Sequence, residues 1–451
     1  MAPRTDAYNF QGLRIPLHPD WKITLAAACL VVSAFIVLKG IYRVYFGPLA
    51  AFPGPRLAGA TYLYEFYHAA IRADFPRQLC LLHEKYGPIV RINPGELHIV
   101  DHDFNMRHFK SKNLDKSGWY YQLARNALAG LHSCHEHKER RHILDPLFNG
   151  EMLRNFMPSI DEHISNFYAR LTDAAETHMP LNMSYLFWAL MNDTVAHYIL
   201  GYKLDGLLVE DLSLVAKTRS YSALHLVSYL RQWPLNFLFE IRHLPLVRLI
   251  VPLIEIEDLV KEHIRPFFAP PSLSVNKPKD CVALRLHTHY PVYRARWRLA
   301  FECSEFMISG GEALTYNATH VLYNLLSNPE CMTRLRTELS MLNPESNEIW
   351  RNLEPGDLPY LNAVISESIR LNDTAAIRFP RESPDPVFYN GQFIPAGTTL
   401  SMTASFMHLD PTLHPSPLQF NPDRWLGPEA ARTKQYCINF GMGNRHCLAR
   451  K

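Results

Sequence analysis

The 451-residue sequence lacks a C-x-x-C pair, a run of like charges, an internal repeat and a low-complexity tract. Its eight cysteines are spread along the chain, which excludes a small disulfide scaffold or a zinc site of the usual spacing and fits a reducing compartment. The formal net charge of +3 is too small to indicate a nucleic-acid partner, so that class is excluded. With 47% hydrophobic and 20% charged residues, the chain is globular and can bury a large core.

One long apolar run lies near the N-terminus. Residues 23–38 carry no charge, and Lys39 and Arg43 can extend the run to residue 45 by placing their charges at the membrane interface. We interpret 23–45 as a transmembrane anchor that follows a polar segment, residues 1–22. A cleaved signal peptide is the alternative, because the uncharged run is shorter than a full span. The basic residues on the two sides balance, so they do not orient the helix.

Beyond the anchor, the patterns predict a mainly helical domain with small sheets. The proline-rich residues 46–56 predict a semi-rigid linker. Residues 86–101 hold two short β-type runs separated by a turn, which indicates a hairpin. Apolar residues three and four apart predict helices between 150 and 265. Residues 266–291 contain five prolines and predict a long loop, whereas no proline interrupts the chain between Pro291 and Pro329, enough for one helix of about 50 Å.

The middle of that long helix reads "SGGEAL". Gly310 and Gly311 each cost about 1 kcal/mol relative to alanine in a helix, so some group must approach the backbone closely. That group could be a ligand, or it could be a second helix that packs on the flat face formed by the glycines. The two explanations are equally good for this motif alone. Glu312 is a carboxylate in an apolar stretch, where burial would raise its pKa and suit it to passing protons.

A second helix, "LPYLNAVISESIRL", places Glu367 and Arg370 three residues apart on one face. Most such pairs are surface ion pairs of little consequence. This helix is otherwise apolar, so the pair should be buried and should need further partners to offset desolvation. Arg424 in "FNPDRW" is a candidate third member.

The chain closes on "FGMGNRHCLARK", in which "CLARK" could begin a helix. A thiolate on Cys447 would then gain from the helix dipole, and a bound metal would keep it deprotonated. Haem iron takes such a ligand, and the thiolate favours O–O cleavage. A small buried cysteine in a glycine-rich turn would explain this motif if it stood alone.

Read in order, "SGGEA", "ESIR", "FNPDRW" and "FGMGNRHC" resemble the signature motifs of cytochrome P450, a haem-thiolate monooxygenase, over nearly the whole chain. The region "HEKYGPIVRINPGELHIVD" is similar to members from the secondary metabolism of filamentous fungi. The resemblance implies a mainly α cytochrome P450 fold, with residues 57–451 as a haem-thiolate catalytic domain holding haem b.

The resemblance also assigns roles to single residues. Cys447 would be the axial iron ligand, within a loop containing Gly443, and Phe440 would shield its sulfur. Glu312, Gly310 and Ala313 would form the catalytic segment of the long helix. Glu367, Arg370 and Arg424 would form a structural triad. The residues that would meet the haem propionates are Arg445, His137, Arg141 and Arg381; a metal site made of His135, His137 and His142 is the weaker alternative.

The sequence departs from the family at two places. Ala313 stands where the family usually has a threonine that assists proton delivery, and Thr315 lies about 200° further around the helix. A water, a substrate hydroxyl, a variant reaction such as desaturation or ring closure, or poorly coupled oxygen activation would each accommodate the change. Past Cys447 the family continues into a helix and a β hairpin that this sequence lacks, so we expect a truncated gene model, an inactive member or a fragment completed by another chain. Ala449 replaces a glycine, a change we expect to be tolerated.

The implied function is oxidation of a lipophilic secondary metabolite, terpenoid-type in particular, with O2 and electrons from an NADPH-cytochrome P450 reductase. The implied location is the endoplasmic reticulum membrane, with one span, lipid around it and the catalytic domain facing the cytoplasm. Two alternatives stay open: a haem-thiolate isomerase or dehydratase that needs no reductase, and a non-catalytic, truncated remnant that binds haem or lacks it. Nothing in the sequence identifies the substrate.

Overall fold

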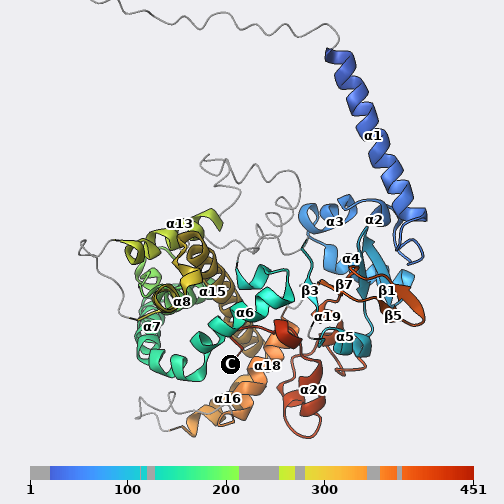
Figure 1. Cartoon of the computed structure of the whole chain (residues 1–451). Helices are drawn as coiled ribbons and strands as arrows, with labels where there is room; N and C mark the ends of the chain where they lie inside the picture. Colours follow the sequence, from blue (N-terminus) through green and yellow to red (C-terminus); the bar gives the residue numbers. More distant parts are fainter. Residues whose placement is uncertain are drawn as a thin grey trace, which may run out of the picture.

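The computed structural model describes residues 21–111, 113–118, 127–212, 253–269, 280–342, 356–372 and 378–450. Within these ranges the chain is mainly helical with two small sheets, so the predicted architecture is confirmed. The longer helices gather on one side of the molecule and the strands on the other, while the first helix projects away from both (Figure 1). The predicted N-terminal polar segment lies outside the described residues, apart from its last two positions.

The projecting helix, α1 (Trp21–Tyr45), is mostly exposed, and Lys22–Tyr45 is the only stretch in the described ranges long and apolar enough to cross a membrane. The predicted linker after it is part of the core. Leu49 and Phe52 are buried against Leu97 and Leu400 of the larger sheet. The proline-rich stretch therefore packs onto the domain instead of acting only as a spacer.

The larger sheet has the strand order β1-β2-β7-β4-β3. The predicted hairpin is confirmed: β1 (Ile89–Asn93) and β2 (Glu96–Ile99) pair antiparallel. β7 (Thr399–Ser401) runs parallel to β2 and antiparallel to β4 (Arg381–Glu382), and β3 (Asp115–Lys116) completes the edge. In the β3–β4 register Lys116 lies opposite Arg381, which brings two basic residues from distant parts of the chain together. β5 (Val387–Tyr389) and β6 (Gln392–Ile394) form the second sheet.

The centre of the helical part is α15 (Arg296–Ser327), the long helix that the proline-free stretch predicted. Its 32 residues span about 48 Å. It contacts α8 (Met183–Leu200), one of the helices expected from spacing, and also α13 (Leu253–Ile264) and α18 (Pro359–Leu371). The other described helices are α2 (Arg56–Ala60), α3 (Leu63–Phe66), α4 (Phe75–Tyr86), α5 (His102–His108), α6 (Cys134–Leu144), α7 (Gly150–Thr177), α14 (Val282–His289), α16 (Pro329–Ser340), α19 (Ala404–His408) and α20 (Ala430–Tyr436).

Two local predictions were wrong. Residues 266–291 were expected to form a loop, yet α14 lies within them, because Val282, Ala283 and Leu286 share one face that is buried in the core cluster around α15. The stretch from Cys447 was expected to begin a helix, but Leu448 and Ala449 form a turn. The Cys447 amide instead donates to the Phe440 carbonyl and closes the loop before it.

Candidate functional site

Cys447 lies in a tight loop whose shape depends on glycine. Gly441 and Gly443 have φ of 72° and 61°, and a Cβ on Gly443 would lie 2.8 Å from the carbonyl oxygen of Phe109. The loop closes where the Cys447 amide donates to the Phe440 carbonyl at 2.6 Å. The thiol of Cys447 is exposed, and the Phe440 side chain is 41% exposed. The backbone thus holds the two residues together, while the shielding role of the Phe440 ring stays a prediction.

The other cysteines near the core offer poorer metal ligands. Burial raises the pKa of the Cys281 and Cys437 thiols to about 11, and burial also raises the pKa of Cys303 well above its ordinary value. Such thiols stay protonated at neutral pH, and the thiolate is the form that binds metals. The described residues contain no group of three or more His, Cys, Asp or Glu side chains that could hold a metal ion. An exposed single cysteine suits a cofactor that brings its own equatorial ligands.

Three basic residues, Lys116, Arg381 and Arg445, gather with His137 at this loop. Lys116 and Arg381 face each other across β3 and β4, and Arg445 donates to the carbonyls of Leu131 and His132 at 2.8 Å each. The Lys116 amide donates to that same His132 carbonyl, so Arg445 and Lys116 share an anchoring point. Sequence reasoning missed Lys116, because its position beside Arg381 depends on strand pairing that no local pattern predicts.

The pKa of His137 shows which side chains surround it in this cluster. Burial lowers the pKa of His137 to about 2, and the four charges that act on it next are all positive: Arg445, Lys116, Arg141 and Arg381. Its Nδ1 is buried and has no hydrogen-bond partner among the described residues. Burial and the nearby Arg381 and Arg445 also lower the pKa of Lys116 well below its usual value. One or two carboxylate groups would offset this crowding of basic side chains and would accept from the unpartnered His137 nitrogen. The cluster therefore fits the propionates of a haem.

Arg141, one of the predicted propionate residues, contacts His446 and Asp145 in this structure. Its guanidinium donates to the His446 carbonyl at 2.6 Å and lies 2.9 Å from His446 Nε2, and it pairs with Asp145 at 3.3 Å. These contacts join α6 to the cysteine loop. In this structure Arg141 thus positions the residue next to Cys447, and a propionate contact by Arg141 stays a prediction.

The three residues of the predicted triad do come together. Glu367 accepts from Arg370 Nε and Nη2 at 2.9 and 2.8 Å and from Arg424 Nε at 3.1 Å. Sequence reasoning missed two further donors, the Trp425 indole at 2.9 Å and the Asn421 amide at 3.1 Å. Burial by itself raises the Glu367 pKa, but the hydrogen bonds and the Arg370 charge outweigh it, so the net shift is downward. Glu367 is therefore held as a buried carboxylate.

Arg370 extends this network toward the cysteine loop. Its Nη1 donates to the His408 carbonyl at 2.6 Å, and His408 Nε2 accepts from the Ile438 amide at 3.0 Å. Ile438 lies shortly before Phe440 in the chain. The ion-pair network is thus connected by hydrogen bonds to the segment that leads into the loop.

The glycines of α15 pack against α8. A Cβ on Gly311 would lie 2.5 Å from Asn192 Oδ1, and one on Gly310 would lie 3.3 Å from Val195. Helix packing therefore accounts for Gly311 in this structure, and a catalytic part for Gly310 stays a prediction. Glu312 is buried, and Ala313 is half-buried.

Thr315 does not take the place of the missing threonine. Its hydroxyl is buried and donates to the Gly311 carbonyl at 2.7 Å, within its own helix. Another acid of α15, Glu305, was missed by sequence reasoning. Burial raises the pKa of Glu305 to about 7, against the opposing positive charge of Lys116. Glu305 lies two turns before Glu312 on the same side of the helix, a spacing that could have drawn attention to it.

Comparison with known proteins agrees with this geometry. The family model described as Cytochrome P450 matches residues 57–451, which contain every site residue discussed above. The chain is 32% identical to the cytochrome P450 monooxygenase sdnE of Sordaria araneosa, over 93% of this chain and 87% of that protein. It is 32% identical to the tryptophan 6-hydroxylase fscE of Fusarium equiseti, with 98% and 88% covered, and 29% identical to the cytochrome P450 monooxygenase TRI4 of Fusarium sporotrichioides, with 95% and 87% covered.

Proposed function

The chain belongs to the cytochrome P450 family, and from this premise we propose that it transfers one oxygen atom of O2 to a lipophilic secondary metabolite. The predicted family, enzyme class and haem cofactor are confirmed. A monooxygenase of this family draws electrons from a redox partner; the second oxygen atom leaves as water, with two electrons and two protons. We propose that NADPH-cytochrome P450 reductase supplies the electrons.

The observation that carries this proposal is the exposed Cys447 in a glycine-shaped loop beside a cluster of basic side chains around His137. Cys447 would supply the thiolate ligand, and Lys116, His137, Arg381 and Arg445 would hold the propionates. A thiolate-ligated haem supplies O2 activation, with electron density pushed toward O–O cleavage. The protein's part is to position that group and to deliver protons. The Glu367 network is connected by hydrogen bonds, through Arg370 and His408, to the segment that leads into the loop.

We assign proton delivery to Glu312, a buried acid in the middle of α15. Ala313 offers no hydroxyl beside it, and the Thr315 hydroxyl donates to a backbone carbonyl. A water or a hydroxyl of the substrate would then complete the route. Glu305, with a pKa near 7, is a second acid on this helix that can exchange protons at neutral pH.

The location and the domain limits are part of the proposal. α1 is compatible with a membrane anchor, and we propose one span at residues 23–45 in the endoplasmic reticulum, with the catalytic domain at 57–451 facing the cytoplasm. A terpenoid-type substrate agrees with a membrane-bound enzyme. A relative named tryptophan 6-hydroxylase argues for including aromatic amino acids among the substrates tested.

Replacing Cys447 with alanine tests the proposal. The full chain, expressed with haem, should give the reduced carbon-monoxide difference band typical of thiolate ligation, and Cys447→Ala should abolish it. Cys437→Ala removes a half-buried thiol of raised pKa and should keep the band. If the wild-type chain binds no haem, the non-catalytic alternative is favoured. If it turns over a peroxide substrate without NADPH, the isomerase or dehydratase alternative is favoured.

Replacing Ala313 with threonine should improve coupling. A hydroxyl one residue after Glu312 restores the donor that the family usually has, so more of the NADPH consumed should appear as product and less as hydrogen peroxide, a change of severalfold. The measurement is product and peroxide formed per NADPH. Ala313→Val adds the same volume without the hydroxyl, and equal coupling in both variants would contradict the assignment.

A further inference from the structure

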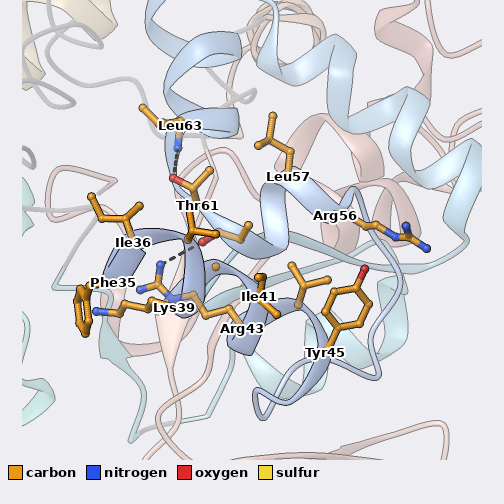
Figure 2. A pocket seen from close by; sticks show the side chains of 14 residues that line it. Phe35, Ile36, Lys39, Ile41, Arg43, Tyr45, Arg56, Leu57, Thr61 and Leu63 are labelled. Carbon is orange, nitrogen blue, oxygen red and sulfur yellow. Dashed lines mark hydrogen bonds between the residues drawn. The ribbon is translucent and has the colours of Figure 1, made fainter. Parts of the chain in front are cut away.

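A groove lies where α1 meets α2 and α3, outside the haem site. It has a volume of about 650 Å³, and Figure 2 shows side chains of the last turns of α1 on one wall and of α2 and the start of α3 on the other. The lining is mostly apolar, with Phe35, Ile36, Leu57 and Leu63 among the exposed large hydrophobic side chains of the protein. A soluble surface would not leave these side chains uncovered, so the groove faces something other than water.

The polar part of the lining carries charge of one sign. Lys39, Arg43 and Arg56 line the groove, and no lining residue is acidic. None of the three forms a side-chain ion pair with any residue of the described chain. Arg43 reaches across from α1 and donates to the Ala60 carbonyl of α2 at 3.2 Å, and Lys39 lies 5.6 Å from the centre of the Phe35 ring (Figure 2). The groove thus combines fixed positive charge with an apolar wall.

The position of the groove along α1 matches the boundary between the hydrocarbon core and the headgroups of a bilayer. A hydrocarbon core of about 30 Å takes about 20 helical residues, so a span that begins at Lys22 leaves the core near Ile41. Arg43 and Arg56 would then lie at the level of the headgroups, while Ile36 would lie within the acyl chains. Tyr45, exposed at the end of α1, suits the same interface.

The groove is held open by the junction itself. The buried guanidinium of Arg91 donates to the carbonyls of Arg43 at 2.8 Å, Leu49 at 3.3 Å and Pro94 at 3.0 Å, which fastens the end of α1 to the hairpin. α1 and α2 also lie close together at Gly40, where a Cβ would be in ordinary contact with Ala60 Cβ at 3.6 Å. The two walls therefore keep their spacing without a ligand.

We propose that this groove binds one anionic phospholipid. The phosphate would meet Arg43 and Lys39, with Arg56 nearby, and an acyl chain would lie along Ile36, Leu57 and Leu63. The site rests on the proposed membrane anchor and goes beyond it, since an anchor needs no particular lipid. The absence of acidic residues from the lining favours an anionic headgroup over a zwitterionic one.

The test uses the full-length haem-loaded protein in nanodiscs of phosphatidylcholine mixed with phosphatidylserine. After transfer to mild detergent, native mass spectrometry counts the lipids that stay bound. The wild type should retain one phosphatidylserine in preference to phosphatidylcholine, and Lys39→Gln with Arg43→Gln should reduce that preference about 10- to 30-fold. Arg77→Gln with Lys85→Gln removes two exposed charges from α4, outside the groove, and should leave it unchanged.

A second variant tests shape without changing charge. Ala60→Phe fills the groove, and it should release the lipid although all three basic residues remain. Equal loss in the α4 control would show general attraction of anionic lipid and overturn the site, as would retention of phosphatidylcholine instead. Extraction of cell membranes with alkaline carbonate separates the two proposals: release of the wild-type chain refutes the anchor, whereas an anchored chain with no lipid preference refutes only the site.

Discussion

Replacing Glu367 with alanine is expected to lower the free energy of unfolding by about 3–5 kcal/mol, the usual cost of leaving a buried charge without its partner. Arg370 is among the largest fully buried side chains, and two of its hydrogen bonds go to Glu367. The Trp425 indole would lose its acceptor as well. Since Arg370 also holds the His408 carbonyl, the variant should lose haem more readily than the wild type.

The measurement is a urea titration of the full chain in detergent, followed by circular dichroism and by the haem absorption band. Glu330→Ala removes an exposed acid from the first turn of α16 and should change the free energy of unfolding by less than about 0.5 kcal/mol. A Glu367→Ala protein as stable as this control would show that the buried network contributes nothing.

The Glu367 pKa also predicts how stability depends on pH. Its pKa in the folded protein lies below the ordinary value of 4.5, so the unfolded chain binds more protons around that pH. The stabilisation is fully present above about 4.5 and is lost as the pH falls through the folded pKa. The difference in unfolding free energy between wild type and Glu367→Gln should therefore be constant near neutrality and shrink below pH 4.5.

Replacing Gly311 with valine is the second change with a large expected effect, about 3 kcal/mol of destabilisation. A Cβ at this position already lies 2.5 Å from Asn192 Oδ1 and 3.0 Å from its Cγ, and valine adds two methyl groups. α15 would have to move away from α8, and Glu312 on the next position would move with it.

The matched control is Gly356→Ala, because a Cβ there meets no atom within 4 Å. Thermal unfolding of both variants gives the comparison. Asn192→Ala should restore part of the stability lost in Gly311→Val, since it removes the side chain that the valine meets. No recovery in the double variant would mean that the glycine is needed for something other than this contact.

The sequence predicts best the features that depend on neighbouring residues. The hairpin at 86–101 and the long helix follow from local patterning, and Glu367 and Arg370 are three residues apart on one helix. Arg424 was placed with them by resemblance to a family, and the structure brings it to 3.1 Å from Glu367. Trp425, the next residue, was missed because a tryptophan gives no sign of where its indole will donate.

Features that depend on pairing between distant segments could not be predicted. Lys116 reaches the cationic cluster only because β3 pairs with β4 in a register that sets it opposite Arg381. Whether Gly311 meets a ligand or a helix depends on where α8 packs, which the glycines themselves do not determine. The prolines around α14 concealed a helix that is stabilised by burial and not by its own propensity.

The attachment of Arg91 to the end of α1 has a consequence for the whole enzyme. Three carbonyls, from α1, the proline-rich stretch and the hairpin turn, accept hydrogen bonds from one buried guanidinium. These hydrogen bonds restrict rotation of the first helix relative to the sheet. A transmembrane helix tilts to match the thickness of the bilayer that holds it. With α1 as the span, a thicker or thinner bilayer would change the angle at which the whole domain stands over the lipid surface.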